Sequence, residues 1–291
     1  MLQRGAAPGR GGDADVPVRD ILILGGGYTG RRVAARLAAR GHRVTVTVRD
    51  AGRWAPLAGV RVVEMALGRT IPRLTRGGEL VLDSVPVLDG PWDGTRELLE
   101  AVGGDAARIV YLSTTGVYGR QREVDETTAA APETEASRLR VAAEEMVLGG
   151  RWSGMVLRPA AIYGPGRGAH VSIPQGRFRL LGDGSNYVSR IHVDDLAALA
   201  ETALLSELGG AWPVADDEPA RSREVAEYVC GLLGCAMPEG AAGEELHETR
   251  RANRRVDGRA VRRALGVELR YPDYRAGIRA AIQAEYGYIH L

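Results

Sequence analysis

Three glycines near the start of the chain have the spacing of a turn that binds nucleotide phosphates. Gly25, Gly27 and Gly30 form the pattern G-x-G-x-x-G directly after the apolar run 21–24 and at the beginning of a helical pattern. The first glycine permits a tight turn, the second lets the backbone approach a pyrophosphate, and the third lets the helix pack closely on the strand. The N–H groups and positive dipole of the helix N-terminus favour an anion there. We therefore predict a dinucleotide-binding site at this turn.

The choice between NAD and NADP depends on residues at the end of the second strand, about 20 residues beyond the turn. Arg49, Asp50 and Arg53 stand in this region. An acidic side chain would hold the ribose 2′-hydroxyl, whereas an arginine would accept a 2′-phosphate. Arg49 follows the strand immediately, so we predict NADP, with NAD as the alternative; Arg49 and Arg53 could also be solvated loop charges. Tyr28 and Thr29, inside the glycine motif, complete this part of the predicted site.

Short apolar runs that read as strands alternate with helical patterns through the first 165 residues. The runs are 21–24, 44–48, 60–65, 80–83, 109–112 and 155–157. They are nearly continuous rather than alternating, as expected for parallel strands buried on both faces. The helical pattern that contains Val33 and Leu37 ends at Gly41, a favourable residue after a helix. This order predicts an α/β protein with a doubly wound parallel sheet, the Rossmann arrangement.

The pattern loosens beyond residue 168, which suggests a division of the chain. We expect a disordered leader at 1–17 and an NAD(P)-binding Rossmann domain at 18–168. A smaller substrate-binding lobe is expected at 169–291, with some elements returning to the main domain. Helical patterns at 191–208, 223–233 and 257–265 fall in this last part.

Composition excludes several classes of protein and mechanism. A net charge of +1 gives no reason to expect nucleic acid as a partner, and no apolar run approaches the roughly 18 residues that cross a membrane. We expect a cytoplasmic monomer or homodimer whose partner is a small-molecule substrate. Two cysteines, Cys230 and Cys235, cannot form a zinc site by themselves, and we interpret them as core residues. All 38 basic residues are arginine, so no mechanism that depends on lysine is available.

Four further segments, in order along the chain, resemble the extended short-chain dehydrogenases/reductases, the group with the nucleotide-sugar epimerases and dehydratases. They are 82–86, 109–119, 157–167 and 190–197. The resemblance implies that Thr114 is the catalytic Ser/Thr at the end of the fifth strand. It also implies that 157–167 surrounds the nicotinamide end of the cofactor. The cofactor contacts expected on this basis are Ser84, Val85, Pro86, Ser113, Arg140, Pro159, Ala160 and Ile162.

The chain departs from this family at the catalytic pair Tyr-x-x-x-Lys. Ala136 stands at the tyrosine position and Arg140 at the lysine position. Arginine could keep the charge and the ribose contact, but alanine has no proton to donate. Such losses resemble an atypical subgroup in which an aspartate tends to replace the active-site asparagine. Asp93 is the candidate here, or else a helix N-cap.

Hydride transfer to a carbonyl also needs a proton donor within hydrogen-bond reach of the oxygen. Thr114 could orient that oxygen, and Tyr163 is the candidate substitute acid, although its ring could equally pack the pocket. We expect His192 to stabilise the start of the following helix, and the acidic and histidine residues at 244–248 to form an exposed helical face rather than a metal site. The sequence thus predicts an NADP-dependent oxidoreductase or epimerase-like enzyme acting on a small polar substrate. The alternative is a non-catalytic NAD(P)-binding sensor or regulatory protein.

Overall fold

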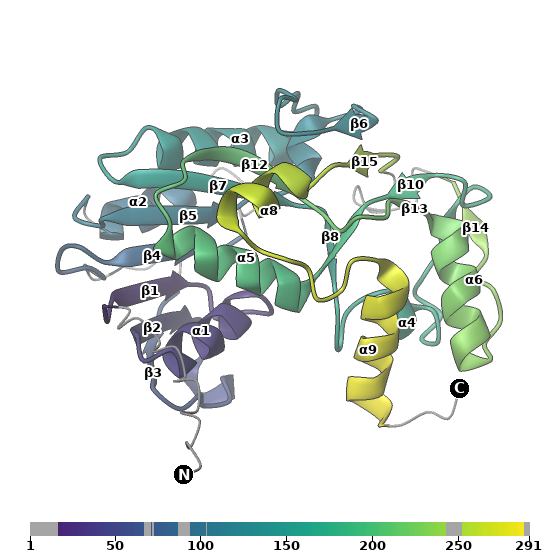
Figure 1. Cartoon of the computed structure of the whole chain (residues 1–291), viewed down its shortest axis with the longest axis horizontal. Coiled ribbons are helices and arrows are strands. Elements are labelled where there is room, and N and C mark those ends of the chain that lie inside the picture. The colour runs from purple at the N-terminus through teal and green to yellow at the C-terminus, as the bar shows by residue number, and fades with distance from the viewer. Residues whose placement is uncertain are drawn as a thin grey trace, which may run out of the picture.

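A parallel seven-stranded sheet forms the centre of the computed structural model, which describes residues 17–66, 71, 73–86, 94–102, 104–242 and 252–287. The strand order is β12-β7-β5-β4-β1-β2-β3, and every neighbouring pair is parallel (Figure 1). The strands are β1 (Asp20–Leu24), β2 (Arg43–Val48), β3 (Val60–Glu64), β4 (Leu80–Asp83), β5 (Arg108–Leu112), β7 (Ser153–Pro159) and β12 (Gly210–Val214). The chain crosses from β3 to β4, on the far side of β1, so the order of the sheet reverses beside β1, as in Rossmann folds.

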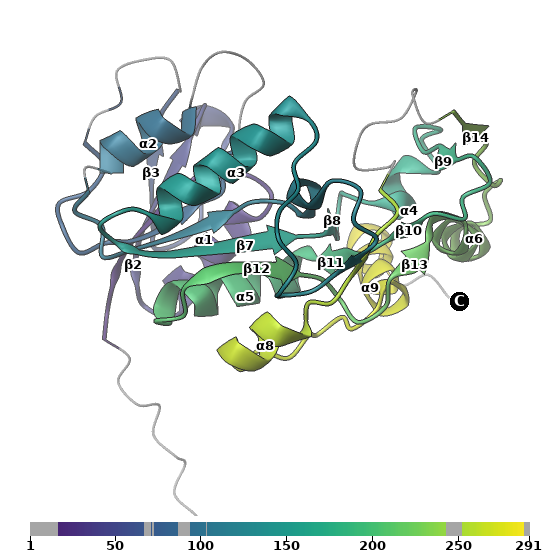
Figure 2. The ribbon, with the colours of Figure 1, turned by 90° about the horizontal axis from the view of Figure 1, so that it is seen from above.

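Helices cover both faces of this sheet. They are α1 (Gly30–Ala39), α5 (Val193–Leu205) and α8 (Arg259–Leu265) on one face, and α2 (Gly94–Val102) and α3 (Glu135–Leu148) on the other (Figure 2). Ile21 and Ile23 of β1 pack under α1 and α5, whereas Leu22 and Leu24 face α2 and α3. Because alternate residues of each strand meet a helix layer, both sets are apolar, and the runs in the sequence are nearly continuous.

A smaller lobe lies beyond the carboxyl ends of the strands (Figure 1). Its core is formed mainly by α4 (Ala169–Ser172), α6 (Ser222–Leu233) and α9 (Tyr274–Tyr286). Short strand pairs connect its segments: β8 (Ala161–Tyr163) with β11 (Arg190–His192), β9 (Leu180–Leu181) with β14 (Gly240–Ala241), and β10 (Tyr187–Val188) with β13 (Ala220–Arg221). A fourth pair, β6 (Glu123–Val124) with β15 (Arg255–Val256), joins the loop after β5 to the segment before α8.

The predicted fold class and all six predicted strands are confirmed. The seventh strand, β12, was not predicted, because Gly210 and Pro213 lie within it and it is an edge strand, where proline is tolerated. Helix α9 was also missed. The proposed division at residue 168 remains a prediction, with α5, β12 and α8 packing on the main sheet from beyond it. Residues 1–16 of the expected leader lie outside the described part of the chain.

Candidate cofactor and active site

The glycine turn has the geometry that its sequence predicts. Gly25 has φ of +89°, a conformation that favours glycine. Its N–H donates to Thr47 Oγ1 at 3.0 Å, and the N–H of Gly26 donates to the carbonyl of Thr47 at 2.8 Å. A Cβ on Gly30 would lie 2.1 Å from the carbonyl oxygen of Gly25. The third glycine is therefore required for α1 to begin directly against the turn.

The N-terminus of α1 is open to an anion. A Cβ on Gly27 would meet no atom of the described part of the chain within 4 Å, and the residue is exposed. Among the described residues, no side chain caps the helix at Thr29, and its first turn carries no acidic residue. N–H groups at a helix start that lack a side-chain acceptor suit a pyrophosphate. These residues therefore fit the phosphate group of a dinucleotide.

The two arginines at the predicted adenosine end of the site have different surroundings. Asp50 caps the 3-10 turn Ala51–Arg53, accepting from the Arg53 N–H at 3.2 Å, and its Oδ2 lies 3.3 Å from Arg53 Nε. Arg49 is exposed and has no ion-pair or hydrogen-bond partner in the described part of the chain. Trp54 Nε1 donates to the Gly26 carbonyl at 2.7 Å, so the indole lies against the glycine turn. The spacing of Trp54 in the sequence does not predict this contact.

Tyr28 connects the glycine turn to the loop after β8. Its hydroxyl donates to the carbonyl of Pro165 at 3.0 Å, and the Arg32 guanidinium lies 4.2 Å from its ring centre. Burial raises the pKa of Tyr28 to about 12. This hydroxyl therefore stays protonated at neutral pH and holds two segments of the site together.

A buried carboxyl group lies at the carboxyl end of β4, where the sequence analysis assigned only its neighbours. Asp83 is 1% exposed and accepts from the Val85 N–H at 3.0 Å. Burial raises its pKa to about 7, opposed by that hydrogen bond and by the Arg140 guanidinium. Arg140 Nη1 lies 3.4 Å from the hydroxyl of Tyr111. Tyr111 of β5 is the residue opposite Asp83 in the register of the parallel strands β4 and β5. Arg140, at the expected lysine position, is thus directed towards Tyr111 and Asp83, which lie side by side on neighbouring strands.

Ser113 and Thr114, at the end of β5, have different surroundings. The Ser113 hydroxyl donates to Glu144 of α3, and Glu144 is also paired with the buried Arg158 of β7, with both Nε–Oε distances at 3.1 Å. This network joins β5, β7 and α3, so the side chain of Ser113 is directed into the protein. Thr114 is partly exposed and accepts from the Gly116 N–H at 3.1 Å, which leaves its hydroxyl proton available to a ligand.

Tyr163 is buried at the junction between the sheet and the smaller lobe. It is 4% exposed, and its hydroxyl donates to the carbonyl of Asp273 at 3.2 Å. A Cβ on Gly277 would lie 2.1 Å from this hydroxyl, so α9 is shaped around the ring. Burial raises the pKa of Tyr163 far above its ordinary value. The geometry favours a packing role over the acid role that the sequence suggested.

His192 has the position that we expected. It caps α5, accepting from the Asp194 N–H through Nδ1 at 3.2 Å. It is 1% exposed, and burial lowers its pKa to about 4. It is therefore neutral near pH 7, as required for an Nδ1 that accepts a hydrogen bond.

The remaining predicted contacts follow the ends of neighbouring strands. Ser84, Val85 and Pro86 come directly after β4, and Pro159, Ala160 and Ile162 lie at the end of β7 and in β8. Because parallel strands end at one edge of the sheet, these residues and the glycine turn face the same side. Asp93 lies outside the described residues.

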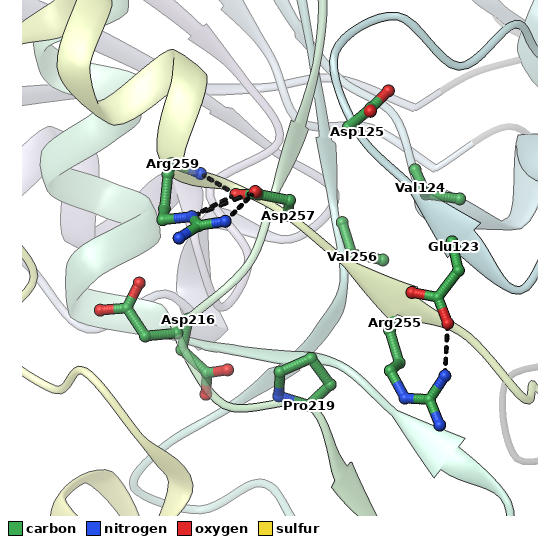
Figure 3. A pocket seen from close by; sticks show the side chains of 10 residues that line it. Glu123, Val124, Asp125, Asp216, Pro219, Arg255, Val256, Asp257 and Arg259 are labelled. Atoms are coloured by element: carbon green, nitrogen blue, oxygen red, sulfur yellow. Dashed lines mark hydrogen bonds and ion pairs between the residues drawn. The ribbon is translucent and has the colours of Figure 1, made fainter.

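A further feature of the structure is a cavity of about 540 Å³ (Figure 3). It lies between β6, β15 and the start of α8 and contains none of the predicted site residues; Arg255 pairs with Glu123 and Arg259 with Asp257 on its walls. Among the described residues no cluster of His, Cys, Asp or Glu could hold a metal ion. None of the described helices is long and apolar enough to cross a membrane.

The sequence and fold of the chain are similar to those of known NAD-binding proteins. The model of the NAD dependent epimerase/dehydratase family matches residues 83–213. A Streptomyces protein, 3-diazoavenalumate denitrifying reductase, is 30% identical, and the match covers 89% of this chain and 98% of the relative. A solved protein of unknown function from Silicibacter pomeroyi is 29% identical, with a TM-score of 0.77 over 92% of this chain and 99% of that one.

A further solved structure, a complex with UDP-glucose and NAD, shares the fold at a TM-score of 0.76 and 21% identity, over 91% of this chain and 97% of that one. The chain belongs to the NAD-dependent epimerase/dehydratase family. At this level it is an NAD(P)-binding oxidoreductase or epimerase.

Proposed function

We propose that the protein is an NADP-dependent oxidoreductase that transfers a hydride to a small polar substrate without the usual tyrosine–lysine pair. The observation that carries this proposal is the uncapped start of α1, beside a glycine turn whose Gly27 is open to a ligand. When bound there, the dinucleotide would supply the hydride.

The preference for NADP rests on Arg49 and Asp50. The Asp50 carboxylate already caps a turn and pairs with Arg53, so it is poorly placed to accept from a ribose hydroxyl. Arg49 is the cation next to it, without a partner among the described residues, and a guanidinium is well suited to a 2′-phosphate.

The proposed acceptor is one that takes a hydride with little help from an acid. Ala136 carries no proton, the Tyr163 hydroxyl already donates to Asp273, and Thr114 is too weak an acid to act alone. An aryl diazonium group has the required property: Ar–N₂⁺ and hydride give Ar–H and N₂, and no proton is consumed. The Streptomyces relative is named for a denitrifying reduction of 3-diazoavenalumate. In such a reaction Thr114 would orient the substrate, and Arg140 would add positive charge near the ribose.

Acceptor classes can be compared directly. The full chain is incubated with NADPH and an aromatic diazo acid, an aromatic aldehyde or a UDP-hexose, and the rate without protein is subtracted. We expect protein-dependent NADPH oxidation with the diazo acid, with the denitrified arene as product. Turnover of the aldehyde alone would contradict the acceptor class and leave the cofactor assignment intact.

A non-catalytic NAD(P) sensor is the second candidate, favoured by the engaged hydroxyl of Tyr163. Tight NADPH binding, without turnover of any acceptor, would support it against the enzyme.

The cofactor preference has its own test, in Arg49→Ala. Loss of a charge-assisted contact to the 2′-phosphate costs about 1.5–3 kcal/mol, so we expect the Kd for NADPH to rise about 10- to 100-fold while the Kd for NADH is unchanged. Fluorescence titration measures both constants. Arg279→Ala, an exposed arginine on α9, is the matched control and should alter neither. Equal weakening of both cofactors by Arg49→Ala would remove the role given to its side chain.

A further inference from the structure

The only two cysteines of the chain meet at the end of α6. Cys230 lies in the last turn of this helix and Cys235 lies just beyond it. Their sulfur atoms are 3.6 Å apart, with the Cys235 thiol donating to the Cys230 sulfur. This is van der Waals contact between two thiols that the sequence analysis treated as separate core residues.

The backbone holds the two thiols in this position. Gly234, at the end of the helix, has φ of +63° and donates its N–H to the carbonyl of Cys230. The N–H of Cys235 donates to the same carbonyl at 3.3 Å. The chain therefore turns back on the helix through a residue that adopts the left-handed conformation without strain. The contact between the sulfurs follows from this turn.

The two thiols differ in access to solvent. Cys235 is partly exposed, whereas Cys230 is 8% exposed and belongs to the core of the smaller lobe, together with Ala226 of α6 and Ile278 of α9. A small oxidant in solution therefore reaches Cys235 first, and Cys230 lies directly behind it.

We propose that Cys230 and Cys235 are a redox-active pair that closes to a reversible intramolecular disulfide. With hydrogen peroxide as oxidant, the Cys235 thiol gives a sulfenic acid and water. The Cys230 sulfur then attacks the Cys235 sulfur, forming the S–S bond and releasing a second water. The two thiols lose two hydrogens and two electrons, and the peroxide is reduced to two waters. A thiol reductant reverses the reaction by exchange.

Only a small movement is needed for closure. The sulfurs approach from 3.6 Å to the bonded distance of about 2.05 Å. Burial raises the pKa of Cys230 to about 11, so little of it is thiolate at neutral pH and ring closure should be faster at higher pH.

Closure also removes a contact of the smaller lobe. The Cys230 thiol donates to the Ala236 carbonyl at 3.3 Å, and the disulfide has no proton to donate. Ala236 leads into β14, which pairs with β9. Oxidation should therefore loosen the segment that leads into this strand pair. This inference is independent of the proposed function.

The test uses the full chain treated with hydrogen peroxide, then alkylated and digested with trypsin without reduction. Both cysteines fall in the fragment 224–250. We expect the oxidised protein to lose both alkylatable thiols and this fragment to lose the mass of two hydrogen atoms, with both changes reversed by dithiothreitol. Oxygen located on either cysteine by fragmentation, apart from that gained by the exposed Met237, would overturn the proposal. So would two thiols that stay free, or two chains linked to each other on a non-reducing gel.

Single variants separate the roles of the two thiols. In Cys230→Ser the sulfenic acid on Cys235 has no partner, so dimedone should label Cys235 where it does not label the native protein. In Cys235→Ser the buried Cys230 should remain unlabelled and alkylatable after denaturation. Dimedone labelling of Cys230 in this variant would overturn the assigned order of attack. Because the readout is the mass of a fragment, retention of activity is not needed.

Discussion

At the scale of single residues, burial shifts the pKa values of two ionisable groups near the glycine turn in opposite directions. Asp83 is almost fully buried and its pKa is about 7, whereas His192 is equally buried and its pKa is about 4. In both cases burial disfavours the charged form. The consequence is that Asp83 exchanges its proton near neutral pH, whereas His192 is already neutral there. Of these two buried groups, Asp83 is thus the one whose charge changes in the physiological range.

Asp83→Asn should change how stability depends on pH. Folded Asp83 keeps its proton up to about pH 7, whereas in the unfolded chain it is released near its ordinary value of 3.8. Between these values the folded state binds more protons, so the native protein loses stability as pH rises. Asparagine does not ionise. The variant should therefore gain stability relative to the native protein from about pH 4 to about pH 7, by on the order of a few kcal/mol.

Urea unfolding of both proteins across this pH range measures the difference. Asp20→Asn is the control, because Asp20 is exposed, pairs with Arg43 and has a lowered pKa, so its effect lies at lower pH. A difference between native protein and Asp83→Asn that is independent of pH would show that Asp83 titrates normally.

At the scale of elements, two glycines of the same sequence motif differ in the space around their Cβ positions. Gly30 is needed by the fold, because its Cβ position is occupied by the Gly25 carbonyl. Within the described part of the chain no atom lies near the Cβ position of Gly27, so a ligand there is the constraint that would require a glycine. The same motif therefore contains one glycine that the packing requires and one that we propose is required by the cofactor.

Gly30→Ala and Gly27→Ala should both weaken cofactor binding but differ in their effect on stability. Gly30→Ala forces α1 away from β1, and we expect a loss of stability of roughly 1–3 kcal/mol together with weaker cofactor binding. Gly27→Ala should leave the melting temperature almost unchanged and raise the Kd for NADPH, since its methyl group would meet the pyrophosphate. Thermal unfolding and fluorescence titration measure the two effects. If Gly27→Ala binds NADPH as tightly as the native protein, the pyrophosphate does not lie on this turn.

At the scale of the whole molecule, the sheet and the smaller lobe are joined at the loop after β8. Tyr28 bonds to Pro165, the Gly166 N–H donates to Glu285 of α9 at 2.6 Å, and Tyr163 inserts its ring against α9. The proposed hydride-transfer site lies beside this junction, so we expect these contacts to hold the two sides of the site at a set distance.

Tyr163→Phe tests whether this tyrosine holds the lobe or donates a proton. Loss of the bond to Asp273 costs about 1 kcal/mol, or about 2–4 °C in Tm, and we expect turnover of any established substrate to be unchanged. A large fall in kcat at unchanged Tm would restore the acid role. Gly277→Ala should lower the Tm further, because its Cβ would meet the same hydroxyl. Gly231→Ala, a helical glycine of α6 with open space around it, is the control and should raise the Tm.

The sequence by itself determined the sheet and the glycine turn that follows its first strand. Both depend on local properties: apolar runs buried on two faces, and glycines at positions where backbone conformation or close contact excludes a side chain. It also predicts that Thr114 and Arg49 belong to one site, because residues that follow parallel strands meet at one edge of the sheet.

Only the tertiary structure decided which of the candidate side chains are free. Tyr163 and Ser113 have the right place in the chain, but their hydroxyls are bound to Asp273 and Glu144, residues 110 and 31 positions away. The raised pKa of Asp83 likewise arises from its burial between the sheet and the helices. Hydrogen-bond partners and desolvation depend on which distant segments pack together, and the spacing of residues along the chain does not contain that information.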